Sequence, residues 1–379
     1  MMRSFFSALL AVVTILVLLA VIVHGDKTQY ARLYLSYCPT YFSSEIAVVD
    51  VSTADGSYKI VGKATPPSSI VFGCSALYSP TFTFEPTTGD IMFDFTSDLG
   101  AFIQIQVNDT TGHVDLTHFT SPSEFFTGFE SFRLDTARNT LVGISGTATQ
   151  DNFCSDGCMG FATLDLATRR AKTIPLPFKA VSDDTCFFDQ QNQLFYTQLS
   201  HAIPGTPYEN CAPLNYGDCL VVINATNGEI VNSVNNMYDN NEHVYRFGLS
   251  SAVPDLDHVQ AFVIGENCRC NVSSQQISYA FDVVDLPRNK FSLQSCAQNN
   301  VTIQTDEWIS SFLPIIPNEP GRFVTSSGNS DGDSSQFLVF DVENGGVMLN
   351  TQLKGLGKAL GAEMGLIYIW GVGGQRQLS

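Results

Sequence analysis

The chain has 379 residues and a formal net charge of −18, from 37 acidic residues against 19 Lys and Arg. Binding to nucleic acid or to an anionic membrane surface depends on clustered cations, so this balance excludes both and suits cations or basic ligands better. Only 15% of the residues are charged, while glycine (29) and phenylalanine (28) are abundant, and this composition argues against a helical protein.

The first 25 residues predict a secretory leader. Arg3 precedes an apolar run from Phe5 to Val23, and Gly25 offers a small residue for cleavage. The run is longer than the usual core of a signal peptide and is long enough to span a bilayer. We therefore predict a signal peptide over 1–25, with a retained signal anchor as the alternative. Either way the remaining chain lies outside the cell, secreted or anchored in type II orientation, and its only membrane contact is that anchor.

An N-terminal extension is expected over 26–43, and a strand repeat begins at residue 44. In each repeat an alternating apolar strand ends at Asp or Asn, a few turn residues follow, and a second strand begins. The segments are 46–61, 103–116, 161–174, 221–230, 280–293 and 337–349. The side chain expected to cap the turn recurs about every 58 residues, at Asp50, Asn108, Asp165, Asn224, Asp285 and Asp341.

A second type of hairpin lies between these segments. Its six members cover 82–95, 132–145, 181–198, 249–264, 312–325 and 359–370. Each period therefore holds two hairpins, or four strands, and the sequence shows no amphipathic helix after residue 25.

Strand-only repeats of this size are typical of solenoids, arrays or propellers, and four antiparallel strands per unit favour an all-β propeller. The first hairpin (46–61) and the last one (359–370) lack a partner within their own period. We expect them to form one mixed blade that joins the two ends of the chain and closes the ring. The sequence thus predicts a six-bladed β-propeller over 44–374, followed by a short tail, 375–379. Seven blades are the alternative, if residues 30–37 start another sheet.

This architecture resembles secreted six-bladed propellers, a group that includes calcium-dependent lactonases and receptor ectodomain propellers. The resemblance covers residues 44–374 and concerns the architecture. The YWTD tetrapeptide of the receptor propellers is absent, and the acidic and amide calcium ligands of the lactonases have no residue-by-residue match. The resemblance therefore implies the fold, and no functional residue is carried over from it.

Ten cysteines in an oxidising compartment predict disulfide bonds, most of them at the end of the ring that carries the longer loops. Cys38–Cys74 and Cys154–Cys158 are natural local pairs. Further along, Cys186, Cys211 and Cys219 compete for one another, and either Cys268 or Cys270 can pair with Cys296. No nearby histidine completes a tetrahedral zinc set, so structural disulfides are preferred to a metal site.

Four sequons are candidate N-glycosylation sites, at Asn108, Asn224, Asn271 and Asn300. Asn108 and Asn224 also fill the turn position of the repeat. The turn by itself accounts for these two asparagines, and surface turns are accessible to glycosylation as well.

Acidic residues recur where the innermost strand of each blade should begin. The candidates for a metal site are Glu130, Asp183, Glu242, His243 and Glu307. If they meet at the mouth of the central channel, their oxygens suit calcium, and carboxylates with a histidine could serve acid–base hydrolysis. The simpler interpretation is a solvated acidic rim. Calcium is the one cofactor that this pattern suggests.

The favoured function is a secreted or surface-anchored glycoprotein that binds a protein or glycan ligand through a loop-rich, disulfide-braced face, without catalysis. A calcium-dependent hydrolase of the lactonase or esterase type is the alternative, and a structural or matrix role is the third. No G-x-S-x-G nucleophile elbow is present, and no catalytic residue is assigned.

Overall fold

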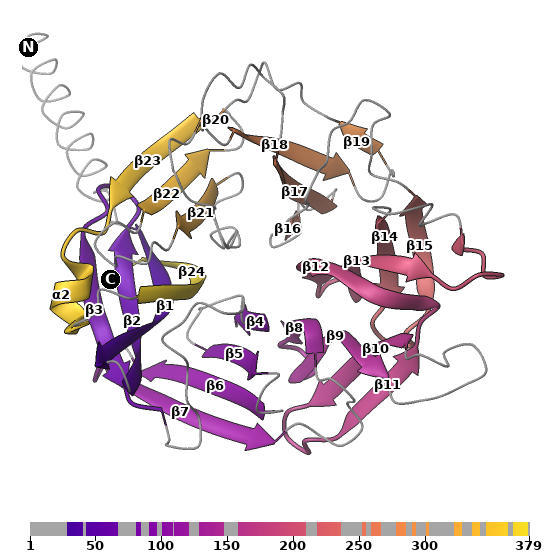
Figure 1. Cartoon of the computed structure of the whole chain (residues 1–379), viewed down its shortest axis with the longest axis horizontal. Helices are drawn as coiled ribbons and strands as arrows, with labels where there is room; N and C mark the ends of the chain where they lie inside the picture. Colours follow the sequence, from indigo (N-terminus) through magenta and orange to yellow (C-terminus); the bar gives the residue numbers. More distant parts are fainter. Residues whose placement is uncertain are drawn as a thin grey trace, which may run out of the picture.

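The described strands form six antiparallel sheets that follow one another around a ring (Figure 1). The computed structural model describes residues 29–40, 43–66, 81–84, 91–96, 101–108, 110–120, 129–147, 158–209, 218–235, 252–254, 259–266, 278–285, 290–292, 301–302, 322–327, 336–341, 346–362 and 367–377. Within these ranges, no helix has the length and hydropathy needed to cross a bilayer. The predicted leader over 1–25 lies outside them.

One sheet combines strands from the two terminal parts of the chain, and we call it the closing sheet. It contains β24 (Ile367–Gln377), β1 (Gln29–Thr40), β2 (Ser43–Ser52) and β3 (Tyr58–Ala64). The second sheet contains β4 (Thr81–Phe84), β5 (Ile91–Thr96), β6 (Ala101–Asn108) and β7 (His113–Thr120). The third contains β8 (Phe129–Asp135), β9 (Thr140–Thr147), β10 (Cys158–Asp165) and β11 (Ala171–Pro175).

The other three sheets follow in chain order. The fourth contains β12 (Phe178–Asp189), β13 (Leu194–Ala202), β14 (Asp218–Asn224) and β15 (Ile230–Asn235). The fifth contains β16 (Ala252–Pro254), β17 (Val259–Glu266), β18 (Ser278–Asp285) and β19 (Lys290–Ser292), and β20 (Val301–Thr302) pairs with β18. The sixth contains β21 (Arg322–Ser327), β22 (Gln336–Asp341) and β23 (Gly346–Gln352).

The strand pairs follow the predicted repeat. The hairpins β2–β3, β6–β7, β10–β11, β14–β15, β18–β19 and β22–β23 occupy the six repeat positions, and we call them outer hairpins. The second type is represented by the inner hairpins β4–β5, β8–β9, β12–β13 and β16–β17. Of the predicted hairpin 312–325, only the part in β21 lies within the described residues.

The closing sheet differs in composition from the prediction. β24 pairs with β1 in antiparallel register from Gln29↔Gln377 to Tyr37↔Ile367. The sheet therefore takes three strands from the N-terminal part of the chain and one from the C-terminal part, and residues 30–37 lie inside it. The expected extension over 26–43 thus contributes an interior strand, and the expected tail begins within β24.

The hairpin predicted over 359–370 is wrong. Its first half contributes to the short helix α2 (Leu356–Leu360), which is bounded by Gly355 and Gly361, both with positive φ. Glycine adopts this backbone conformation without steric cost, so it favours the start and the end of this turn of helix. The side chains of Leu356 and Leu360 pack into the core between the closing and sixth sheets.

The core lies between successive sheets, because strands of the ring bury apolar side chains on both faces. Val49 of the closing sheet packs with Phe337 of the sixth, whereas Val48 packs with Ile103 of the second. The second and third sheets meet through phenylalanines, with the rings of Phe102 and Phe129 centred 5.7 Å apart, edge to face. Between the third and fourth sheets, the rings of Phe161 and Phe195 are also 5.7 Å apart.

One turn geometry recurs along the outer edge of the ring. The fourth residue after the capping side chain has positive φ, and it packs on the outermost strand of the preceding sheet. A Cβ atom on Gly56 would lie 2.2 Å from Cγ2 of Thr351, and one on Gly228 would lie 2.5 Å from Cδ1 of Ile174. These positions need glycine for both conformation and space.

The same contact is present at two more junctions. A Cβ atom on Gly112 would lie 2.6 Å from the carbonyl oxygen of Val61. In the third sheet the position is held by Arg169, whose guanidinium lies 5.1 Å from the ring centroid of Phe119, a cation–π contact. The outer turns therefore connect four consecutive junctions of the ring, including that between the sixth and closing sheets.

Candidate functional site: the loop face

The two ends of the ring carry different kinds of connection. Strands alternate in direction within an antiparallel sheet, so the turns of the inner and outer hairpins lie at one end, which we call the turn face. The links between the second and third strands, and the links between sheets, lie at the opposite end, which we call the loop face. The loop-face links in the closing, third and fourth sheets are 41–42, 148–157 and 203–217.

The turn face is built from turns that satisfy their own polar groups. Oδ1 of Asp165 accepts hydrogen bonds from the backbone N–H of Ala167 at 2.9 Å and of Thr168 at 2.7 Å. These bonds, that of Thr168 above all, hold the pKa of Asp165 below its usual value. Asp135, Asp189, Asn108 and Asn224 accept backbone N–H groups in the same way.

The assignment of Asp50 to this turn position is wrong. The hydroxyl of Ser52 accepts the turn hydrogen bond instead, from the backbone N–H of Ala54 at 3.3 Å. Asp50 is buried and receives two hydrogen bonds from the guanidinium of Arg32, at 2.8 and 2.9 Å. An alternating Val-Asp-Val pattern does not distinguish an inward aspartate with a cationic partner from one that begins a turn.

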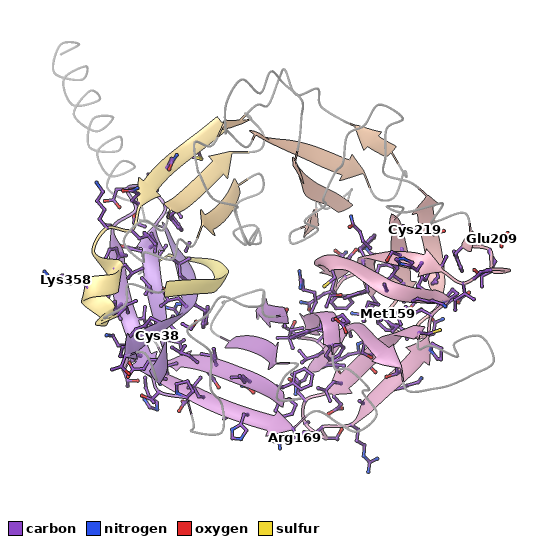
Figure 2. All side chains as sticks on the ribbon, in the orientation of Figure 1. Cys38, Met159, Arg169, Glu209, Cys219 and Lys358 are labelled. Atoms are coloured by element: carbon purple, nitrogen blue, oxygen red, sulfur yellow. The ribbon has the colours of Figure 1, made fainter. Side chains whose placement is uncertain are left out.

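The described cysteines of the loop face are cross-linked. Cys38, Cys158 and Cys219 are disulfide-bonded, and each lies at or near the loop-face end of its strand; Figure 2 labels Cys38 and Cys219. Cys186 is buried in β12 with a reduced thiol, so its place among the disulfide candidates is wrong. The pairings stay predictions, because Cys74, Cys154, Cys211, Cys268, Cys270 and Cys296 lie outside the described residues.

Two of the predicted metal ligands lie in irregular parts of innermost strands. The register of β8 shifts between Phe129 and Ser131, so Glu130 occupies a β-bulge and is half-buried. In β12 the register shifts between Val181 and Cys186, and Asp183 falls in that interval. Bulges redirect side chains and are frequent beside functional sites.

The described residues do not test the rest of the predicted metal set. Glu242, His243 and Glu307 lie outside the described residues, as do the sequons at Asn271 and Asn300. In the part of the chain that the structure describes, no three His, Cys, Asp or Glu residues form a group suited to a metal ion. The calcium site therefore stays a prediction.

A buried serine beside one bulge was not anticipated. Ser131 is 1% exposed, and its Oγ has no hydrogen-bond partner among the residues that the structure describes. Buried hydroxyls are almost always paired with protein or with ordered water, so this atom has capacity for one more polar group. The sequence gives no signal for it, since serine is ordinary in strands.

The loop-face end of the closing sheet carries a tyrosine–carboxylate pair. The Tyr37 hydroxyl donates a hydrogen bond to Oε2 of Glu45, across β1 and β2. Burial, and then the bond to Glu45, raise the pKa of Tyr37 above its ordinary value. Nζ of Lys63 lies 5.3 Å from the ring centroid of Tyr37 and donates a hydrogen bond to the carbonyl oxygen of Leu360.

Part of the longest described loop is ordered by its own contacts. The backbone N–H of Gly205 donates to Oε2 of Glu209 at 2.9 Å, and the ring of Tyr208 packs 5.6 Å from that of Phe178. Glu209 lies at the outer edge of the fourth sheet (Figure 2). Exposed Pro204 and Pro207 further restrict this segment. The loop thus presents a fixed surface at the loop face.

Comparisons with known proteins give structural likeness without a family. No family model matches the chain, and no curated protein matches it in sequence. TolB from Acinetobacter baumannii is similar in structure, with TM-score 0.47 and 10% identity over 92% of this chain and 67% of that one.

Two other similar structures carry enzyme names. The periplasmic gluconolactonase PpgL from Pseudomonas aeruginosa has TM-score 0.46 and 12% identity, over 86% of this chain and 96% of that one. A putative 6-phosphogluconolactonase from Bacteroides fragilis has TM-score 0.44 and 11% identity, over 87% and 95%. At such identities and scores, no function is transferred to this chain.

Proposed function

We propose that the six sheets are the blades of a closed six-bladed β-propeller and that this is a secreted or surface-anchored binding protein. Its loop face takes up a protein or glycan ligand, without catalysis. The fold part of the proposal is supported by the pairing of β24 with β1 and by turn contacts at four consecutive junctions.

The difference between the two faces is the observation that carries the binding function. Short turns on one face satisfy their own backbone groups and leave few polar atoms for a partner. The other face carries the long links 148–157 and 203–217, three disulfide-bonded cysteines and two innermost strands with register shifts. Loops fixed over a rigid scaffold are where binding sites are usually found.

A matched pair of substitutions tests which face binds. The full chain, expressed through a eukaryotic secretory route, is applied to a glycan array and to cells displaying surface proteins. Pro207→Arg places a long cation on the exposed loop-face segment, and Ala167→Arg places the same side chain on an exposed outer turn. We expect at least a tenfold loss of binding for Pro207→Arg only. Equal losses for both variants, or a loss restricted to Ala167→Arg, would contradict the proposal.

The calcium-dependent hydrolase is kept as a second candidate because Glu130 and Asp183 both lie at irregularities of innermost strands. A metal that binds only the native state raises the melting temperature. The test is a thermal melt with and without millimolar calcium, combined with turnover of lactones and aryl esters. A shift that Glu130→Gln abolishes, together with turnover, would favour the hydrolase over the binding protein. No shift and no turnover would remove it.

A further inference from the structure

Two sequons occupy the same structural position in different sheets. Asn108 and Asn224 each end the third strand of a sheet, β6 and β14, and begin an outer turn on the turn face. In both, the residue two positions later is an exposed threonine, Thr110 or Thr226. The two acceptor sequences are therefore presented by one backbone geometry, about two sheets apart along the ring.

The turn orients each asparagine through its oxygen. Oδ1 of Asn108 accepts hydrogen bonds from the backbone N–H of Thr110 and of Thr111, both at 3.1 Å. Oδ1 of Asn224 accepts from the backbone N–H of Thr226 at 2.9 Å. Because these donors fix the oxygen, the Nδ2 group lies on the other side of the amide, and among the described residues it donates no hydrogen bond.

The surroundings leave room for a large substituent. Asn108 is exposed and Asn224 is half-buried, and the turn residues after them, Thr111 and Asn227, are exposed. Neither amide nitrogen is needed by the fold. In the third sheet the same position is held by Asp165, whose oxygen forms the same turn without an amide. The protein thus needs the side-chain oxygen at this position and leaves the nitrogen available.

We propose that Asn108 and Asn224 are both N-glycosylated, so that two glycans project from the turn face of the ring. The donor is an oligosaccharide linked to a lipid pyrophosphate. The bond from Nδ2 to the sugar C1 forms, the bond from C1 to the pyrophosphate oxygen breaks, and the amide loses one proton. This inference goes beyond ligand binding and rests only on the secretory part of the proposed function.

Glycans at these two positions would restrict the turn face sterically. A branched, hydrated oligosaccharide on the second and another on the fourth sheet would keep large partners from this end.

The experiment separates loss of the glycan from loss of the turn. The full chain is secreted from a eukaryotic host, and its mass is measured before and after enzymatic removal of N-glycans. Asn108→Asp and Asn224→Asp keep the turn oxygen, so each should lose one glycan mass with an unchanged melting temperature. Wild-type protein without a glycan at either residue would overturn the inference, even if loop-face binding is intact.

A gain-of-site variant tests the geometry itself. Asp165→Asn combined with Ala167→Thr creates an Asn-Leu-Thr sequon at the equivalent turn of the third sheet. We expect one additional glycan in this double variant and none in Asp165→Asn alone. Absence of the additional glycan would show that the turn position does not determine glycosylation. A chain that is not secreted and carries no glycan would remove both this inference and the secretory part of the proposed function.

Discussion

The closing sheet and the third sheet use the same outer turn with different chemistry. In the third sheet Asp165 caps the turn, and its carboxylate stays at the surface. In the closing sheet Ser52 caps the turn, and the carboxylate lies two residues earlier, buried against Arg32. The outer hairpin of the third sheet, one continuous stretch of chain, is fixed by its turn, whereas the sheet that joins distant parts of the chain carries an internal charge pair.

The position of this pair suggests its role. Arg32 and Asp50 are direct cross-strand partners in the β1–β2 register, and both are almost fully buried. If β1 slipped by one residue along β2, Arg32 and Asp50 would be buried apart from each other. Burying two unpaired charges costs far more free energy than burying the ion pair. We infer that the pair fixes the β1–β2 register, so that the other edge of β1 is correctly placed for β24.

The largest predicted effect comes from breaking this pair. Arg32→Ala leaves the Asp50 carboxylate buried without its guanidinium and should lower the free energy of unfolding by about 3–5 kcal/mol. Urea denaturation followed by circular dichroism measures it. The matched control is Arg138→Ala in the third sheet, because that arginine is 37% exposed and Asp135 retains two backbone donors. The control should lower the free energy of unfolding by about 2 kcal/mol or less, because the buried Asp135 keeps its two backbone hydrogen bonds.

A double variant distinguishes register from simple stability. Arg32→Met with Asp50→Leu removes both charges and should recover most of the lost stability, because apolar side chains of similar volume often replace a buried pair without cost. If Arg32→Ala costs no more than Arg138→Ala, the contrast between the closing and third sheets fails.

An intermediate effect is predicted at the junction between the third and fourth sheets. Gly228→Ala combines a positive φ with a Cβ atom 2.5 Å from Cδ1 of Ile174. We expect a loss of about 2–4 kcal/mol from conformation and overpacking together. Gly205→Ala has the same conformation with nothing within 4 Å, and should cost about 1–2 kcal/mol. If thermal or urea unfolding shows equal losses of stability for Gly228→Ala and Gly205→Ala, the contact between Gly228 and Ile174 contributes nothing to stability.

The smallest predicted effect is a pH dependence of stability, and the outer turns of the closing and third sheets share it. Backbone hydrogen bonds, from Ser57 and Thr168 respectively, hold the pKa values of Asp55 and Asp165 below the usual range. Each carboxylate therefore contributes stability above its ordinary unfolded pKa, and this contribution disappears as the pH falls through the lowered value. NMR titration should give a low pKa for both residues.

The substitution Asp165→Asn checks the sign. The amide oxygen still accepts the turn hydrogen bonds but does not titrate in this range. Wild type should exceed the variant in stability at neutral pH, and the difference should vanish under acidic conditions. A difference that grows as the pH falls would contradict the assignment.

Much of the ring could be predicted from the sequence because two local signals repeat together. Alternating apolar strands and a capping residue such as Asn108 or Asp165 locate the outer hairpins without knowledge of distant contacts. The misplaced Asp50 and the short helix at 356–360 have a different cause. Both depend on tertiary partners, Arg32 in one case and the core of the closing sheet in the other, which local patterning does not contain.

The candidate site was predicted less well for the same physical reason. The sequence indicated that Glu130 and Asp183 begin innermost strands, and the structure adds the register shifts that displace their backbone. It gave no indication of the buried Ser131, whose Oγ has no partner among the described residues. Whether a buried polar group finds a hydrogen-bond partner depends on side chains from other sheets. A periodic pattern in the local sequence carries no information about those side chains.

The neighbouring position of β24 and β1 has an engineering consequence. Since these two strands already exchange backbone hydrogen bonds, a short linker from residue 377 back to residue 29 would add a covalent connection without moving either strand. New ends could then be opened between the exposed residues Pro204 and Gly205, giving a circular permutant with the same sheets in a shifted chain order. In such a permutant the fourth sheet would become the one assembled from the two ends of the polypeptide.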